Sequence, residues 1–243
     1  MFKKIVFGLL TCLLALTLVG CGAKKDEAKP AADAKPEAKQ ETKAEVAKPE
    51  APADKAVLAY AQLYAYGVVE DENEKAAGMT EKDTKPVEEK VIGDLLKAFS
   101  QFPLSDENVQ NATSNYIQKL HNGMEITATL KKDDPEHPVV ELSAETLDVA
   151  GAMKVSQTSE DIQALAAALQ ELHAQGITDE QLKENPEFQN AVLEVIDNFT
   201  NEYPLNPRAS IDVTCEVNQG SDGKFYWAPQ DPTAVAKFVT GQK

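Results

Sequence analysis

Residues 211–227 read IDVTCEVNQGSDGKFYW, and this stretch decides the fold class. Apolar and polar residues alternate from Ile211 to Val217, the period-two pattern of a strand with one buried face. The Gly-Ser-Asp-Gly turn at 220–223 then leads into the run Phe-Tyr-Trp. We therefore predict a β-hairpin whose buried face carries Cys215.

A second hairpin is predicted upstream, where residues 124–130 and 140–145 alternate around an Asp-Asp-Pro-Glu turn at 133–136. Because each strand has one apolar and one polar face, the sheet should be wet on one side and covered by helices on the other. The predicted fold class is α+β, with an antiparallel sheet of about four strands in two hairpins, covered on one face by helices.

Apolar residues at helical spacing supply those helices. The spacing predicts helices around residues 57–64, 87–102, 109–120, 162–172, 188–199 and 233–239. Capping residues set several boundaries: Ser105 precedes the third helix, and the second should begin near Pro86. Thr178 and Gln181 form a capping box that opens a further short turn of helix.

The chain begins with a basic pair and an apolar run from Ile5 to Val19, shorter than the roughly 20 residues of a membrane-spanning helix. The run ends in Leu-Val-Gly-Cys at 18–21, which resembles the lipobox of bacterial lipoproteins. The resemblance implies that residues 1–20 are a lipoprotein signal peptide and that Cys21 is the lipidation site. Two or three acyl chains such as palmitate would then anchor the protein to a membrane. An ordinary signal peptide, which would release a soluble protein, is the alternative.

Residues 22–53 consist almost entirely of Ala, Lys, Glu, Asp and Pro and contain no aromatic residue. Such a segment buries too little apolar surface to offset its ordering entropy, so we expect residues 21–53 to form a disordered tether behind the lipidated Cys. Fully extended at ~3.1 Å per residue, it would reach on the order of 100 Å. Residues 54–243 remain as a single α+β domain.

The whole chain holds 40 acidic and 24 basic residues, and the excess acid lies in the predicted domain because the charges of the tether balance. An acidic surface repels phosphate backbones and anionic lipids, which argues against nucleic acid as a partner and against a polybasic membrane contact. Of the three cysteines, Cys12 leaves with the signal peptide and Cys21 is lipidated. Cys215 then has no partner for an intrachain disulfide.

Each candidate catalytic or binding residue has a simpler structural interpretation. Cys215 belongs to an apolar strand face and lacks a neighbour that would lower its thiol pKa, so we favour packing over nucleophilic catalysis. The run at 225–227 could be a stacking platform for a sugar or peptide. Alternation instead sends Phe225 and Trp227 to the core with Tyr226 opposite, and we favour that arrangement.

No metal site, cofactor or catalytic residue is predicted. His121, His137 and His173 lack the spacing of zinc ligands. The acidic clusters, Glu70 to Glu74 and Asp133 to Glu136, lack the pattern of a calcium loop and should be solvated turns. Nucleophile-elbow, phosphate-loop and Ser-x-x-Lys motifs are also missing from the sequence, which favours a non-enzymatic protein.

The layout of lipobox, Ala/Lys/Pro/Glu tether and α+β domain resembles a group of uncharacterised lipoproteins from Firmicutes and their relatives. Segments similar to that group are residues 77–83, 91–96 and 224–229. The resemblance implies a location on the extracytoplasmic side of a membrane, at the cell surface or in the periplasm, held through lipid on Cys21. It implies no activity, because the family has a domain of unknown function.

Three functions stay open from the sequence. The first is a tethered, non-enzymatic domain that binds an envelope protein or a small ligand between its sheet and helices. The alternative is an envelope-acting hydrolase that uses unrecognised carboxylates. The third is a structural role in which acidic surfaces hold wall cations or other lipoproteins.

Overall fold

The computed structural model describes residues 48–241, and in that range it confirms the α+β fold class with one open antiparallel sheet and nine helices. The strands pair in the order β1-β2-β3-β4. Their bounds are β1 Ile126–Lys132, β2 Val139–Ala144, β3 Ala209–Gln219 and β4 Phe225–Pro229. Both predicted hairpins are present, as β1–β2 and β3–β4.

The register places the apolar residues of neighbouring strands opposite one another. Ala128 faces Leu142, and Leu142 faces Ile211, so one apolar row crosses three strands. The other face is polar, and there the hydroxyl oxygens of Ser143 and Ser210 lie 2.5 Å apart. Alternation in the sequence thus becomes one apolar and one polar sheet face, as predicted.

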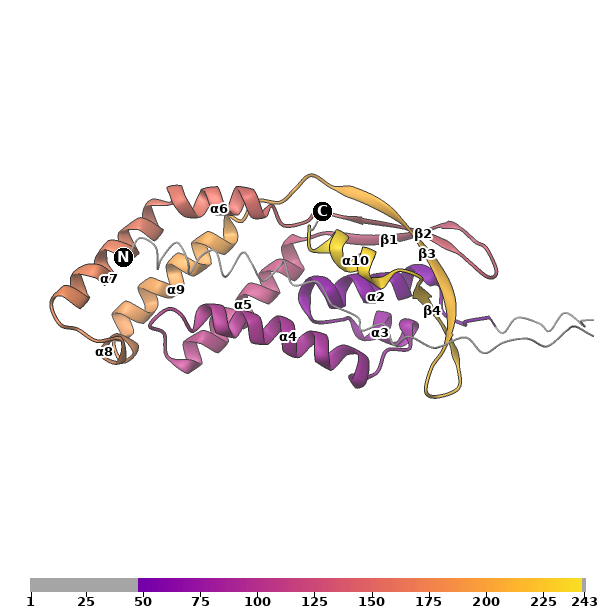
Figure 1. Ribbon diagram of the computed structural model, residues 1–243, viewed down its shortest axis with the longest axis horizontal. Helices are drawn as coiled ribbons and strands as arrows, with labels where there is room; N and C mark the ends of the chain where they lie inside the picture. The colour runs from indigo at the N-terminus through magenta and orange to yellow at the C-terminus, as the bar shows by residue number, and fades with distance from the viewer. Residues whose placement is uncertain (1–47, 242–243) are drawn as a thin grey trace, which may run out of the picture.

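Strand β3 divides its pairing between two neighbours. Residues 209–214 pair with β2, and residues 215–219 pair with β4. Helix α2 (Ala53–Tyr66) lies across the apolar face, with α10 (Pro232–Val239) beside it (Figure 1). The core between them is fully buried and includes Val57, Val140, Leu142, Cys215 and Val235.

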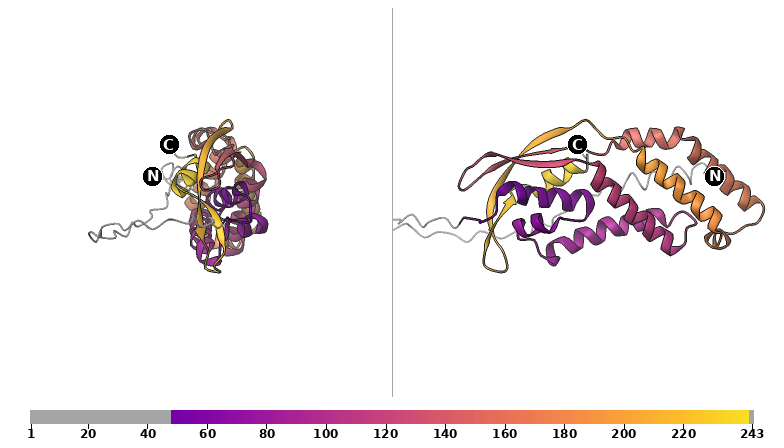
Figure 2. Two further views of the ribbon diagram at one scale, coloured as in Figure 1. Left: turned by 90° about the vertical axis from the view of Figure 1, so that its right-hand side faces the viewer. Right: turned by 180° about the vertical axis from the view of Figure 1, so that it is seen from behind.

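A helical lobe extends from the sheet along the long axis of the molecule (Figure 1). It consists of α4 Glu81–Phe99, α5 Asp106–Gly123, α6 Val149–Thr158, α7 Glu160–Ala174, α8 Asp179–Lys183 and α9 Pro186–Asn201. The lobe has its own apolar core, in which Phe99, Leu104, Leu182 and Val192 are fully buried. Seen from behind in Figure 2, the sheet and helices α6–α9 occupy opposite ends of the molecule.

A small apolar cluster of Tyr66, Met124 and Leu147 connects the two larger cores. The Tyr66 hydroxyl donates a hydrogen bond to the Met124 carbonyl oxygen at 2.9 Å, which fixes the end of α2 against the start of the sheet. This joint holds the sheet and the helical lobe together where α5 passes into β1.

Two sequence predictions about helices were wrong. Helix α4 begins at Glu81 instead of near Pro86, because the Thr80 backbone N–H and hydroxyl both donate to the Asp83 carboxylate, at 2.9 and 2.7 Å, and cap the helix earlier. Pro86 lies inside the helix on its exposed side, so α4 lacks the bond that an N–H at this position would donate to the Lys82 carbonyl. The acidic residues after Glu70, expected in a turn, open helix α3 (Asp71–Ala77), where negative charge at a helix start is favourable.

Candidate functional site

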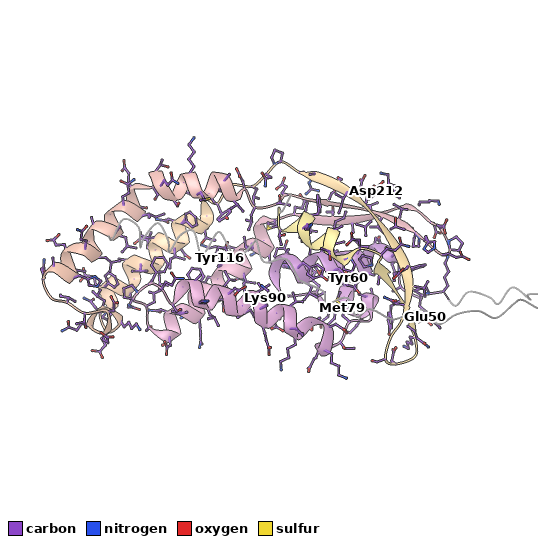
Figure 3. All side chains as sticks on the ribbon, viewed as in Figure 1. Glu50, Tyr60, Met79, Lys90, Tyr116 and Asp212 are labelled. Carbon is purple, nitrogen blue, oxygen red and sulfur yellow. The ribbon has the colours of Figure 1, made fainter. Side chains whose placement is uncertain are left out.

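Two grooves flank Tyr226 where α2, α3 and the start of α4 meet the β3–β4 hairpin. The first, named here the Lys48 groove, has a volume of about 670 Å³ and the second, the Tyr60 groove, about 710 Å³. The two grooves share five lining residues: Gly78, Met79, Thr80, Ser221 and Tyr226. Figure 3 places Tyr60, Met79 and Glu50 at this end of the molecule and Tyr116 in the helical lobe.

Gly78 lets the Tyr226 ring approach the end of α3. It ends the helix with a left-handed φ of 60°, and its N–H donates to the Lys75 carbonyl while Met79 N–H donates to the Glu74 carbonyl. These two bonds form a Schellman motif. A Cβ atom at Gly78 would lie 2.3 Å from the Tyr226 ring, so a side chain there would displace the ring.

Hydrogen bonds with Asp222 hold the outer end of Tyr226. The Tyr226 hydroxyl donates to Asp222 Oδ2 at 2.7 Å, and the Lys224 backbone N–H donates to Asp222 Oδ1 at 3.0 Å. The first bond is the main cause that lowers the pKa of Asp222 and raises the pKa of Tyr226. The Asp222 carboxylate therefore stays ionised and accepts hydrogen bonds. It carries no proton that it could donate as a general acid.

Aromatic rings from α2 line the Tyr60 groove. The rings of Tyr60 and Tyr64 lie one helical turn apart, with centroids separated by 6.4 Å, and Met79 and Val87 are among the apolar residues that line the groove with them. Burial, followed by the nearby Asp83 charge, raises the pKa of Tyr60, so the phenol stays neutral. The groove is thus an aromatic surface open to solvent.

Acidic side chains stand at the rim of the Tyr60 groove. Glu81 and Asp83 line it at the start of α4, together with Lys82. Asp83 already accepts the two capping bonds from Thr80. The Asp83 carboxylate therefore caps the start of α4. It also adds negative charge to the rim of the groove.

The first described residues form one wall of the Lys48 groove. Lys48, Glu50 and Ala51 line it together with Lys75 and residues of the β3–β4 turn. Pro49 between them is buried, and Lys48 Nζ lies 4.0 Å from Asp133 Oδ1 in the β1–β2 turn. Residues 48–51, at the end of the predicted tether, therefore lie near the turns of both hairpins.

The structure places Cys215 in the sheet core, as its alternation predicts. The side chain is 0% exposed, and burial raises the pKa of the thiol to about 12. A neutral, inaccessible thiol is a packing residue and does not act as a nucleophile. In the aromatic run, Trp227 is buried as predicted, Phe225 is half-buried, and Tyr226 lines both grooves.

The three histidines lie in separate places. The His121 ring packs edge-on against Tyr66 with centroids 5.2 Å apart, and His173 Nε2 lies 2.9 Å from Asp179 Oδ1. His137 Nδ1 lies 3.2 Å from Gln230 Nε2. Within residues 48–241, no three His, Cys, Asp or Glu side chains gather in a way that could hold a metal ion.

The acidic turn between β1 and β2 is built from local hydrogen bonds. Asp134 Oδ1 accepts the backbone N–H groups of Glu136 and His137, at 3.1 and 3.0 Å, and Lys132 Nζ donates to Asp134 Oδ2 at 2.9 Å. The Lys132 bond contributes most to lowering the pKa of Asp134 well below its usual range. The carboxylate stabilises the turn itself.

Cys21, the predicted lipidation site, and the predicted signal peptide lie outside the described residues. Among residues 48–241, no helix combines the length and the apolar character that crossing a bilayer requires.

The α3–α4 loop was the feature that sequence reasoning missed. Its signal was the Gly-Met-Thr segment at 78–80 followed by Asp83, which is a helix stop directly before a capping box.

No known protein-family model and no curated protein matches the chain. A similar solved structure is that of YcdA from Bacillus subtilis, described as a candidate lipoprotein, with 16% sequence identity and a TM-score of 0.45. The similarity covers 78% of this chain and 55% of YcdA, so the chain spans about half the length of that protein. A likeness at this level gives no information on the function of this chain.

Proposed function

We propose that the chain is a cell-envelope lipoprotein, anchored through lipid on Cys21 at the extracytoplasmic face of a membrane. The lipobox-like residues 18–21 after an apolar run support the proposal. The first described residues lie at the sheet end of the molecule, away from helices α6–α9 (Figure 2). The chain upstream of Lys48 therefore joins the described part at the end opposite helices α6–α9.

We propose that the domain itself is a non-enzymatic binding domain and that the Tyr60 groove is its binding site. The observation that carries this proposal is the lining: Tyr60, Tyr64, Tyr226 and Met79 meet around one open groove. Tyrosine gives a large contact area at low conformational cost, and methionine adapts to varied surfaces. Both residue types are enriched where proteins contact partners.

The groove best fits an extended, positively charged peptide segment of an envelope partner. Its open shape suits a peptide laid along the surface more than an enclosed small molecule. Glu81 and Asp83 at the rim, with the net negative charge of the chain, would attract basic residues. Tyrosine faces can also contact Lys and Arg through cation–π interactions.

Selection from a displayed library of random decapeptides, with the chain from residue 21 onward as the target, tests this proposal. Peptides rich in Lys or Arg should be enriched. Their affinity for a Met79→Ala variant should be several-fold lower. Val68→Ala is the matched control, because Val68 is an exposed apolar residue (46%) outside the groove lining. Enriched peptides that bind Met79→Ala as tightly as Val68→Ala, or no enrichment at all, would contradict the proposal.

A further inference from the structure

Strand β1 is an edge strand, because the order β1-β2-β3-β4 pairs it with β2 alone. The Glu125 carbonyl accepts from the Glu145 N–H at 3.4 Å, so the backbone groups of residues 125, 127 and 129 face β2. Those of residues 126, 128 and 130 point the other way, toward the edge. Within residues 48–241, no backbone group of another element bonds to these three residues.

The same edge carries an exposed apolar side chain. Leu130 is 38% exposed, one of two large apolar side chains that are exposed among residues 48–241. Ile126 and Ala128, on the same face of β1, are half-buried. A bulge and two lysines follow at 130–132, and both features limit pairing along a strand edge. The stretch that can pair is therefore confined to residues 126–130.

We propose that two copies of this chain associate through this edge, with β1 antiparallel to β1 of the second copy and Ala128 opposite Ala128. Each Ile126 then lies opposite Leu130 of the second copy. These residues are the ones whose N–H and carbonyl groups face the edge, so each opposed pair exchanges two backbone hydrogen bonds. The pairing also covers part of the exposed Leu130 side chain.

Charge on the polar face selects this register. It brings Glu125 opposite Lys131 of the second copy. Within one copy, Glu125 pairs with Arg208, and Lys131 Nζ lies 2.8 Å from an Asp212 carboxylate oxygen. Positive and negative side chains therefore alternate across the junction. A shift by two residues in either direction would place Glu125 opposite Thr129 or Asp133, which lack the positive charge.

Pairing over so short a stretch gives a weak, reversible dimer in solution, because the area buried is small. Anchoring both copies to one membrane would raise their effective concentration and favour the dimer. This consequence rests on the proposed lipid anchor, and the self-association itself does not. The dimer also leaves the Tyr60 groove out of the interface, since no residue of β1 lines that groove.

Sedimentation velocity tests the dimer with the chain from residue 21 onward carrying Cys21→Ser, between micromolar and millimolar concentration. The described fold spans residues 48–241, so this chain retains it. Leu130→Ser should weaken dimerisation several-fold. Val68→Ser is the matched control, because Val68 is also exposed (46%) but lies outside β1, and it should leave the dimer unchanged. A chain that stays monomeric at every concentration, or equal effects of the two substitutions, would overturn the proposal.

Two charge reversals test the register. Glu125→Lys and Lys131→Glu each place like charges opposite one another in a homodimer, so each variant alone should dimerise several-fold more weakly than the native chain. Both residues are exposed, so their ion pairs contribute little to the fold, and circular dichroism checks this.

An equimolar mixture of the two variants restores opposite charges at both ends of the junction and should recover the dimer. A mixture that stays as monomeric as its components would contradict the register, as would variants that dimerise like the native chain. The measurement uses no peptide ligand, so its failure is distinct from failure of the proposed binding function.

Discussion

The ring of Tyr226 lies directly against the backbone of Gly78, where an added Cβ would come within 2.3 Å of ring atom Cδ2. This contact joins the α3–α4 loop to β4, two segments far apart in the sequence. Both grooves are built around it, since Gly78 and Tyr226 line each of them. The geometry of the candidate site therefore depends on one glycine and one ring.

A Gly78→Ala variant should be destabilised by about 2–4 kcal/mol, because it combines a left-handed φ with a clash against Tyr226. Chemical denaturation followed by circular dichroism measures the change. Gly93→Ala is the control, since a Cβ there meets nothing within 4 Å in the middle of α4, and it should stabilise by about 0.5–1 kcal/mol. Equal effects of the two substitutions would show that the ring contact is unimportant.

Gln189 is a second position with a large expected effect. Its buried amide accepts from Ser105 N and Asn108 Nδ2, at 2.8 and 2.9 Å, and donates to the carbonyls of Pro103 and Leu182. Gln189→Ala should cost about 2–4 kcal/mol, because four hydrogen bonds are lost in the interior. The exposed Gln170→Ala variant should be nearly neutral by the same denaturation measurement. A neutral Gln189→Ala would contradict this network.

The bond between Tyr226 and Asp222 predicts a change in a titration. In Tyr226→Phe, the pKa of Asp222 should rise toward its ordinary value of 3.8, because the largest cause of its lowering is removed. Carboxyl carbon shifts followed by NMR between pH 2 and 6 would report it. Asp134, whose low pKa comes from Lys132 and local backbone N–H groups, should not change. An unchanged Asp222 titration would mean that the hydroxyl bond is absent in solution.

Cys215 should make the fold sensitive to alkaline pH. Burial raises the pKa of its thiol from 9.0 to about 12, so the folded chain keeps a proton that the unfolded chain releases above pH 9. Stability from this group is full below pH 9 and is lost as the pH rises toward 12. Between pH 8 and 9.8, the free energy of unfolding should fall by about 1 kcal/mol more in the native chain than in Cys215→Ala. Identical pH profiles would place the thiol in contact with water.

Local patterns in the sequence predicted the local parts of the fold. Alternation gave both hairpins and the buried side of Cys215, since a strand face is read directly from every second residue. The cap at Ser105 is present, because its hydroxyl accepts from Asn108 N at 3.3 Å. The predicted capping box at 178–181 is also present, because the Thr178 backbone N–H donates to Gln181 Oε1 at 2.9 Å.

Contacts between distant segments could not be predicted in this way. The pairing of β2 with β3 spans four intervening helices, and no local pattern encodes which strands meet across them. Gln189 reads as one polar residue on an amphipathic helix, although it joins segments more than 80 residues apart. The candidate site was missed for the same reason, since the contact of Tyr226 with Gly78 arises only when α3 packs against β4.

The most direct test of the proposed anchoring is intact-mass and N-terminal peptide mass spectrometry of the protein from the membrane fraction of cells that express it. The proposal predicts a chain that begins at Cys21 and carries the added mass of two or three acyl chains, and that leaves the membrane only with detergent. Cys21→Ala should abolish both the cleavage and the added mass. A chain that keeps residues 1–20, or one that washes from membranes in buffer alone, would contradict the proposal.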